Sequence, residues 1–198
     1  FSTSISTNSY LLGADTMQYG GSGATAVNVG TYSIVPSGLY SNDNRGYAIS
    51  YANGTLSIQK ADLTLSGTRP YDGSTVMAGT YLTAHGVNGE TFTVVGAGAT
   101  GNLSTRNVQT AQPLATSAGL ALGSSDNGGL SSNYNALGIA GSSVTVTPKP
   151  VTLTAPTASK VYDGTSSYVA TSDDLSALSA QLGVVGDGVS ASTLSFVN

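Results

Sequence analysis

Apolar and polar residues alternate over several short runs of the chain, which is the pattern of strands with one buried face and one exposed face. The alternation predicts strands over residues 31–35, 47–51, 55–59, 90–95 and 143–147. These runs are rich in Val, Ile, Thr and Tyr, and Gly, Asn, Asp and Pro stand between them. The pattern predicts an all-β chain with many tight turns.

Two of these strands flank Asn53-Gly54, a dipeptide that strongly favours a two-residue hairpin turn. A hairpin of this kind would place Tyr51 opposite Leu56 on an apolar face, with hydroxyl side chains on the other face. A second hairpin of the same type is expected around Gly141-Ser142, between the run at residues 134–139 and the strand that follows. Each hairpin would then cover a core on one side only.

One short helix is expected at residues 173–182. Ser172 is the predicted N-cap, the carboxylates of Asp173 and Asp174 suit the first turn, and Gly183 ends the helix. Three leucines at helical spacing share one face of this segment, which predicts that the helix packs on one side.

The tripeptide Tyr71-Asp72-Gly73 returns as Tyr162-Asp163-Gly164. Each copy follows a short β-like run, at residues 62–65 and 151–154, and precedes two small hydroxyl residues. An Asp-Gly pair favours a tight turn, because Asp accepts hydrogen bonds from its own downstream backbone and Gly tolerates a positive φ. The Tyr can bury its ring while its hydroxyl stays near water. The motif is therefore predicted to be structural rather than catalytic.

Other landmarks recur in the same order, and the offset between the copies grows from 79 to 91 residues. The stretch at 28–31 matches 107–110, the strand at 54–58 matches 142–146, and Lys60-Ala61 matches Lys149-Pro150. An ordered set of matches with a slowly growing offset is the signature of an internal repeat. We therefore predict tandem, β-sandwich-like repeat domains of about 90 residues, joined end to end.

The repeat divides the chain into three predicted segments. Residues 1–60 would be the C-terminal part of a first repeat, 61–149 a complete second repeat, and 150–198 the N-terminal part of a third. The links at Lys60-Ala61 and Pro148–Pro150 carry no flexible spacer, so a stiff array is expected. The incomplete first and third segments are complementary, which predicts head-to-tail association of copies of this chain.

The low content of charged residues limits the classes of partner that the chain is expected to bind. Charged residues make up only 8% of the sequence, and the formal net charge is −4 with six basic residues. Nucleic-acid binding needs a basic surface, so a nucleic-acid partner is not expected. The sequence also lacks an apolar run of the length that a membrane-spanning helix requires, so no membrane insertion is expected. With no cysteine, the chain has no disulfides and no cysteine-based metal site.

The tripeptide with the preceding Leu63-Thr64-Leu65 resembles the YDG domain. The stretch from Asn28 through Asn53-Gly54 to Lys60-Ala61 resembles the related MBG (mostly-β, glycine-rich) module. Both families occur as tandem arrays in large secreted bacterial surface proteins, including filamentous-haemagglutinin-like adhesins. The resemblance implies a structural stalk, located outside the cell at the bacterial surface, and supplies no binding residues.

Two features depart from the family pattern. Gln109 stands where the first copy has Gly30, and the helical segment after Ser172 has no counterpart in the middle repeat.

Several residues that could carry chemistry have simpler structural explanations. His85 is the only histidine, and neither a Ser-Asp arrangement nor a second ligand accompanies it. The glycine-rich stretch at 96–101 is similar to a phosphate-binding loop, but no helix is expected after it, so we interpret it as a turn. Asn53 and Asn102 each begin a glycosylation sequon by pattern alone.

The acidic residues are the remaining candidates. Calcium could use the oxygens of residues 42–44, of Asp126-Asn127, or of Asp173, Asp174 and Asp187. Each group offers fewer oxygens than calcium usually takes, so turn chemistry and helix capping are the preferred explanation. The sequence predicts no cofactor and no metal.

The leading functional hypothesis is a structural stalk or spacer of a secreted adhesin or extracellular filament, without enzymatic activity. Its partners would be neighbouring repeats or copies of the same protein. The alternative is an adhesive module that binds a glycan or a host surface protein. An exposed aromatic patch that one repeat has and its neighbour lacks would favour the alternative.

Overall fold

The computed structural model describes residues 18–37, 50–190 and 193–195, and most of its regular structure is β, as predicted. The chain divides into two compact units. The first ends at Ala61 and also includes Leu130–Asn135, and the second comprises residues 62–129 and 136–198. The boundary after Ala61 lies one residue from the predicted end of the first segment.

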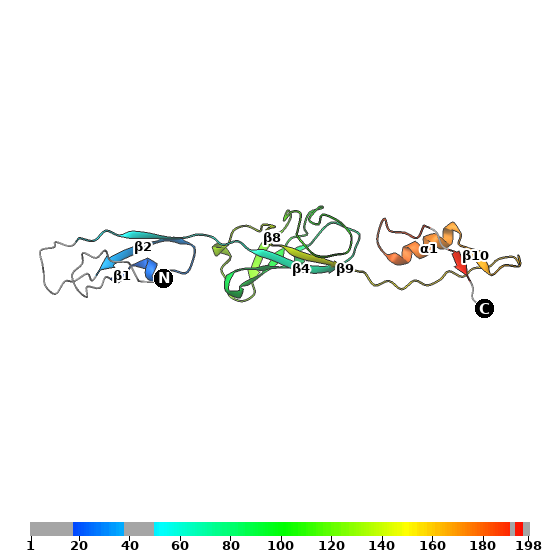
Figure 1. Ribbon diagram of the computed structural model, residues 1–198, viewed down its shortest axis with the longest axis horizontal. Coiled ribbons are helices and arrows are strands. Elements are labelled where there is room, and N and C mark those ends of the chain that lie inside the picture. Colours follow the sequence, from blue (N-terminus) through cyan, green and yellow to red (C-terminus); the bar gives the residue numbers. More distant parts are fainter. Residues whose placement is uncertain (1–17, 38–49, 191–192, 196–198) are drawn as a thin grey trace, which may run out of the picture. The chain divides into compact units, whose positions relative to one another are not determined.

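The first unit contains an antiparallel three-stranded sheet in the order β1-β2-β3 (Figure 1). Its strands are β1 (Gln18–Gly20), β2 (Gly30–Ser37) and β3 (Gly54–Ile58), and a short 3-10 helix, η1 (Ser22–Thr25), follows β1. The pairing of β2 with β3 runs from Gly30 opposite Ile58 to Ile34 opposite Gly54. Within the described ranges, β3 pairs with β2 on one side, and no strand lies along its other side.

The predicted hairpin at Asn53-Gly54 is wrong. Tyr51 and Asn53 lie outside any strand, Gly54 is the first residue of β3, and its φ is not positive. Leu56 lies opposite Tyr32 of β2 instead of opposite Tyr51. The predicted partner strand at 47–51 lies largely outside the described residues, but its last two residues form no strand.

The second predicted hairpin is wrong in the same way. Residues 135–139 contain no strand, although β9 (Ser143–Thr147) forms as predicted. β9 pairs instead with β7 (Gln109–Gln112), with Gln109 opposite Val146. In both places the strand pairs with one more distant in the sequence, although the local residues favour a hairpin turn.

The second unit is built on a six-stranded mixed sheet in the order β7-β9-β4-β5-β6-β8. β4 and β9 are parallel and run side by side (Figure 1), and the other neighbours are antiparallel. The remaining strands are β4 (Thr64–Pro70), β5 (Leu82–His85), β6 (Thr91–Val95) and β8 (Ala121–Ser125). The short 3-10 helices are η2 (Gly79–Tyr81), η3 (Val87–Gly89) and, in the first unit, η4 (Ser131–Asn133).

One face of this sheet carries the core. Alternate residues of the central strands are buried, and these are Leu65, Leu82, Ala84, Phe92, Val94, Val144 and Val146. The loops that follow β4, β6 and β7 contribute Met77, Leu103 and Leu114, respectively, to the buried set. The predicted sandwich is therefore not the arrangement between residues 62 and 149, because all the described strands there belong to one sheet.

Buried Asn102 holds the loop region together. Its side-chain amide donates to the carbonyl oxygens of Thr116 (2.8 Å) and Ala118 (3.1 Å), and its side-chain oxygen accepts from the N–H of Ala99. A buried amide with three partners can fix irregular backbone where no second sheet does so.

The C-terminal part of the second unit contains β10 (Ser167–Val169), the helix α1 (Ser172–Leu182) and β11 (Thr193–Ser195). The helix confirms the prediction, but the cap is Thr171 and not Ser172. The hydroxyl of Thr171 accepts from the N–H of Asp174, whose carboxylate accepts from the Thr171 N–H in return. Gly183 ends the helix in the left-handed conformation, as expected. No strand forms at the predicted run of residues 151–154.

Candidate functional site

The first Tyr-Asp-Gly loop continues directly from β4. The Tyr71 N–H donates to the carbonyl oxygen of Thr147 at 2.8 Å, which extends the β4–β9 pairing by one residue. Asp72 then accepts from both the N–H and the hydroxyl of Ser74, each at 2.9 Å. Gly73 adopts a φ of 77°, where a side chain would be strained. The predicted turn chemistry is confirmed here.

Arg69, the last buried residue of β4, stabilises this loop through hydrogen bonds and an ion pair. Its side chain is 1% exposed, forms an ion pair with Asp72, and donates to the carbonyl oxygens of Pro70 (2.9 Å) and Ser74 (2.7 Å). Partial burial opposes ionisation of Asp72, but the bonds from Ser74 and the charge of Arg69 outweigh it. The pKa of Asp72 therefore lies below its ordinary value.

The second loop repeats this arrangement. Asp163 accepts from the N–H and the hydroxyl of Thr165, each at 2.9 Å, and Gly164 has a φ of 74°. Lys160 forms an ion pair with Asp163 at 2.8 Å and donates to the carbonyl oxygen of Thr165 at 2.7 Å. The hydrogen bond from Lys160 and those from Thr165 hold the pKa of the Asp163 carboxyl well below its usual range.

The two loops thus share a basic residue that the sequence analysis missed. Arg69 and Lys160 each lie three residues before the Asp, and each bonds that Asp and the carbonyl oxygen two residues after it. The sequence contained the signal. Residues 66–75 align with 157–166 without a gap, at a constant offset of 91, and the basic residue precedes the Tyr by two positions in both.

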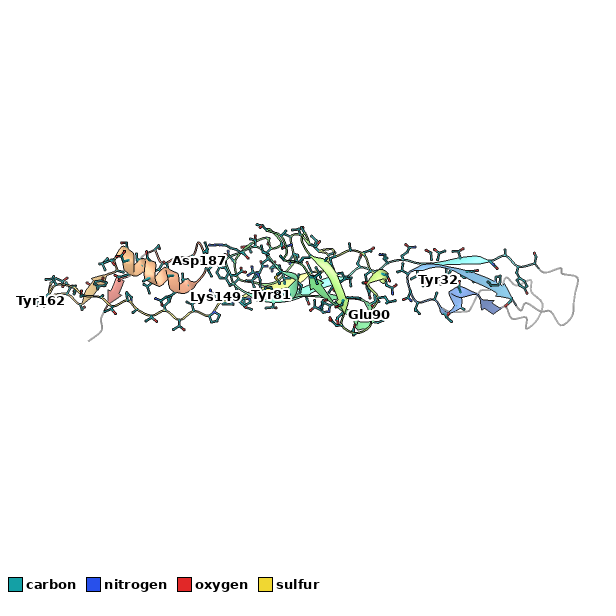
Figure 2. The ribbon with its side chains drawn as sticks, turned by 180° about the vertical axis from the view of Figure 1, so that it is seen from behind. Tyr32, Tyr81, Glu90, Lys149, Tyr162 and Asp187 are labelled. Atoms are coloured by element: carbon teal, nitrogen blue, oxygen red, sulfur yellow. The ribbon has the colours of Figure 1, made fainter. Side chains whose placement is uncertain are left out.

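The two tyrosines differ. Tyr71 donates its hydroxyl to Asp187 at 2.7 Å, and Asp187 also forms an ion pair with Arg106 at 3.0 Å. The hydrogen bond to Asp187 raises the pKa of Tyr71. Tyr162 is 93% exposed (Figure 2), so the expectation that its ring is buried is wrong.

A further set of contacts surrounds the first loop. A Cβ at Gly73 would collide with the side chain of Val184, which shows how closely the turn after α1 approaches the loop. Lys149 donates to the carbonyl oxygens of Leu182 and Gly183, both at 2.9 Å. A lysine at these carbonyls satisfies the C-terminal end of the helix and complements its dipole.

The other candidate residues have structural roles. His85 and Ser66 are joined by a hydrogen bond of 2.7 Å between Nε2 and Oγ, which links β5 to β4. The side chain of Asn127 accepts from the N–H of Thr91 and donates to the carbonyl oxygen of Gly89. Buried Asn102 has no room for a glycan in the folded chain.

The glycine-rich stretch at 96–101 contains three glycines with positive φ and forms a turn, as predicted. The acidic group at 42–44 lies outside the described residues. Among those that are described, no three His, Asp or Glu side chains gather as a metal site would require. None of the helices in the described part of the chain has the length and apolar character needed to cross a bilayer.

The contacts of both Tyr-Asp-Gly loops are those of structural turns. Each closes a turn with a carboxylate, a basic side chain and a left-handed glycine, and the first also bonds the segment that follows the helix. Comparison of the chain with protein-family models, with curated proteins and with solved structures gave no match.

Proposed function

We propose that this chain is a structural spacer, made of tandem repeat units of about 90 residues, in the stalk of an extracellular bacterial surface protein. The location and the stalk role come from the resemblance to YDG and MBG modules. The repeat has independent support in the geometry of the strands and loops.

The observation that carries the proposal is a shared strand register. Gly30 pairs with Ile58 in the first unit, and Gln109 pairs with Val146 in the second. The sequence alignment matches Gly30 to Gln109 and Ile58 to Val146 at offsets of 79 and 88 residues. Two strand pairs that differ in loop length thus meet at this corresponding pair of residues, and the second pairing shifts by one residue at a bulge between Gln109 and Gln112. This agreement supports an internal repeat.

The loops give a second line of support. The bonds of Arg69 to Asp72 and Ser74 recur in Lys160, Asp163 and Thr165 at one offset of 91 residues. A spacer repeats its architectural contacts because each unit must present the same joint to the next one.

The joints also suit a spacer. Pro148 and Pro150 restrict the backbone around Lys149, whose ammonium group is held by the helix C-terminus. Asp187 is held by Tyr71 and Arg106. A link with no flexible residues and several fixed polar contacts transmits orientation between segments.

Small-angle X-ray scattering of the monomeric chain tests this function. We expect an elongated particle with a narrow distribution of maximum dimension. Insertion of a Gly-Ser-Gly-Ser spacer after Pro148 should broaden that distribution, whereas the same insertion at the exposed turn around Gly89, between β5 and β6, should leave it unchanged. A globular scattering profile, or equal flexibility of the parent chain and the Pro148 insertion, would overturn the spacer proposal.

A further inference from the structure

The outer edge of β3 is an acceptor for a strand. β3 (Gly54–Ile58) bonds β2 on one side, and in the part of the chain that the structure describes no strand bonds its other side. An edge of this kind presents free N–H and C=O groups and is a template for pairing with another strand.

In the second unit, the strand that corresponds to β3 has a neighbouring strand on both sides. β9 corresponds to β3, and β7, on one side of β9, corresponds to β2. The other side of β9 holds β4 in parallel, from Ser66 opposite Ser143 to Pro70 opposite Thr147. The open side of β3 therefore corresponds to the β4 side of β9, which identifies the kind of strand that fits there.

The chain contains a second strand of this kind. The shared loop geometry aligns Ser66–Pro70 with residues 157–161, and the aligned residues are Ser with Thr, Gly with Ala, Thr with Ser, Arg with Lys, and Pro with Val. Residues 150–166 form no strand, and Val161 is 89% exposed. This segment has the sequence of a central strand without the neighbours of one.

From these observations we infer that residues 157–161 of one copy pair in parallel with the open edge of β3 in a second copy. This inference rests on the repeat organisation under Proposed function, and it names the partner as another molecule of this chain. The β4–β9 register transfers directly. Thr157 lies opposite Thr55, Ser159 opposite Ser57, and Lys160 opposite Ile58.

Gly67 of β4 is replaced by the larger Ala158 in the donor segment, and this difference is compatible with the pairing. A Cβ at Gly67 would collide with the carbonyl oxygen of Tyr81, which precedes β5, and no β9 atom is among its nearest neighbours. Ala158 stands at the corresponding position of the donor. The methyl group of Ala158 therefore does not obstruct the edge of the donor that corresponds to the β9-facing edge of β4.

The interface joins different surfaces of the two copies, so it is heterologous and propagates head to tail. In this pairing each copy supplies residues 157–161 as the donor and β3 as the acceptor. The expected product is an open series of oligomers, which lengthens with protein concentration.

The absence of cysteine allows a direct test. Ser57→Cys chains are mixed with Ser159→Cys chains that carry a size tag, and the mixture is oxidised. The two positions lie opposite each other in the transferred register, about 4.8 Å apart as neighbouring strands are, which is within disulfide range. We expect a disulfide-linked heterodimer on non-reducing gels.

Thr145→Cys is the matched control, because Thr145 occupies the position of Ser57 in β9, where β4 already fills the edge. A mixture of Thr145→Cys with Ser159→Cys should give no more heterodimer than two Ser159→Cys chains give homodimer.

Two proline variants of the Ser159→Cys donor test whether backbone pairing causes the link. The Tyr71 N–H bonds β9, so the N–H groups of Arg69 and Gly67 point to the same side and that of position 70 points away. Ala158→Pro should reduce the heterodimer yield at least tenfold, to the control level. Val161→Pro should preserve the yield, because β4 has Pro70 at that position.

A yield equal to the Thr145 control would overturn the inference. So would a yield that Ala158→Pro leaves unchanged, or a Ser57→Cys, Ser159→Cys double variant that links only within one chain. Each of these results leaves the elongated scattering profile untouched, so failure of the inference is distinguishable from failure of the spacer function.

Discussion

The Tyr71 hydroxyl donates a hydrogen bond of 2.7 Å to the carboxylate of Asp187, 116 residues further along the chain. Asp187 is in turn held by Arg106. The first Tyr-Asp-Gly loop is thus bonded to the segment that follows α1, whereas the same tyrosine of the second loop, Tyr162, is 93% exposed.

This difference predicts unequal effects of the same substitution. Tyr71→Phe removes the bond to Asp187 and should lower the midpoint of thermal unfolding by roughly a few degrees. Tyr162→Phe removes a hydroxyl from an exposed ring and should leave the midpoint unchanged. Circular dichroism melts of both variants check this, and equal midpoints would show that the Tyr71–Asp187 bond contributes nothing to stability.

The contacts of Arg69 predict that different substitutions at this position destabilise the fold to different extents. Arg69→Met keeps apolar volume but removes the donor of the loop carbonyls and the positive charge beside Asp72, and should cost about 2 kcal/mol of unfolding free energy. Arg69→Lys should cost less, because Lys160 makes the equivalent bonds in the second loop. Urea denaturation measures both. A lysine variant as unstable as the methionine variant would mean that the guanidinium geometry, and not the charge, braces the loop.

Two strand glycines should respond in opposite ways to alanine. At Gly54 a Cβ would lie 3.6 Å from the Ile34 side chain, an ordinary contact, so Gly54→Ala should be neutral or stabilising by up to about 1 kcal/mol. At Gly67 a Cβ would collide with the Tyr81 backbone, so Gly67→Ala should cost about 1–3 kcal/mol. Loss of stability on Gly54→Ala would instead support a left-handed turn at Asn53-Gly54.

Three aspartate carboxylates determine how the stability of the fold is expected to change at low pH. In the folded chain the pKa of Asp72, of Asp163 and of Asp174 is below the ordinary value of 3.8. A lowered folded pKa gives stability that is present above the unfolded pKa and lost as the pH falls through the folded value. Unfolding free energy should be level from about pH 7 to 5 and fall below about pH 4. Urea titrations across this range check it, and greater stability at about pH 3 than at pH 6 would contradict it.

Local chemistry was predictable from the sequence. The carboxylate and glycine of each Tyr-Asp-Gly turn act within a few residues, and so do the start and stop signals of α1 (Ser172–Leu182). The cap was displaced by one residue because Thr171 and Ser172 are chemically equivalent candidates. Only the capping box with Asp174 distinguishes them.

Long-range pairing was not predictable. Asn53-Gly54 favours a hairpin locally, but the pairing of β3 with β2 decided the outcome. The burial of Arg69 was missed because an arginine in a polar stretch suggests an exposed side chain, and its acceptors are loop carbonyls that composition does not reveal. The sandwich prediction failed because all the described strands between residues 62 and 149 join one sheet, and the loop residues Met77, Leu103 and Leu114 supply buried apolar side chains instead of a second sheet.

We propose that the segment at residues 157–161 and the sheet that contains β3 belong to one kind of repeat unit. This proposal is tested most directly by joining them covalently, with Asn198 followed by Phe1 in a single rearranged chain. We predict one cooperative unfolding transition, and nuclear Overhauser contacts between Lys160 and Ile58 in the register of Arg69 and Val146. A rearranged chain that unfolds without cooperativity, or whose β3 shows contacts to β2 alone, would contradict the repeat account.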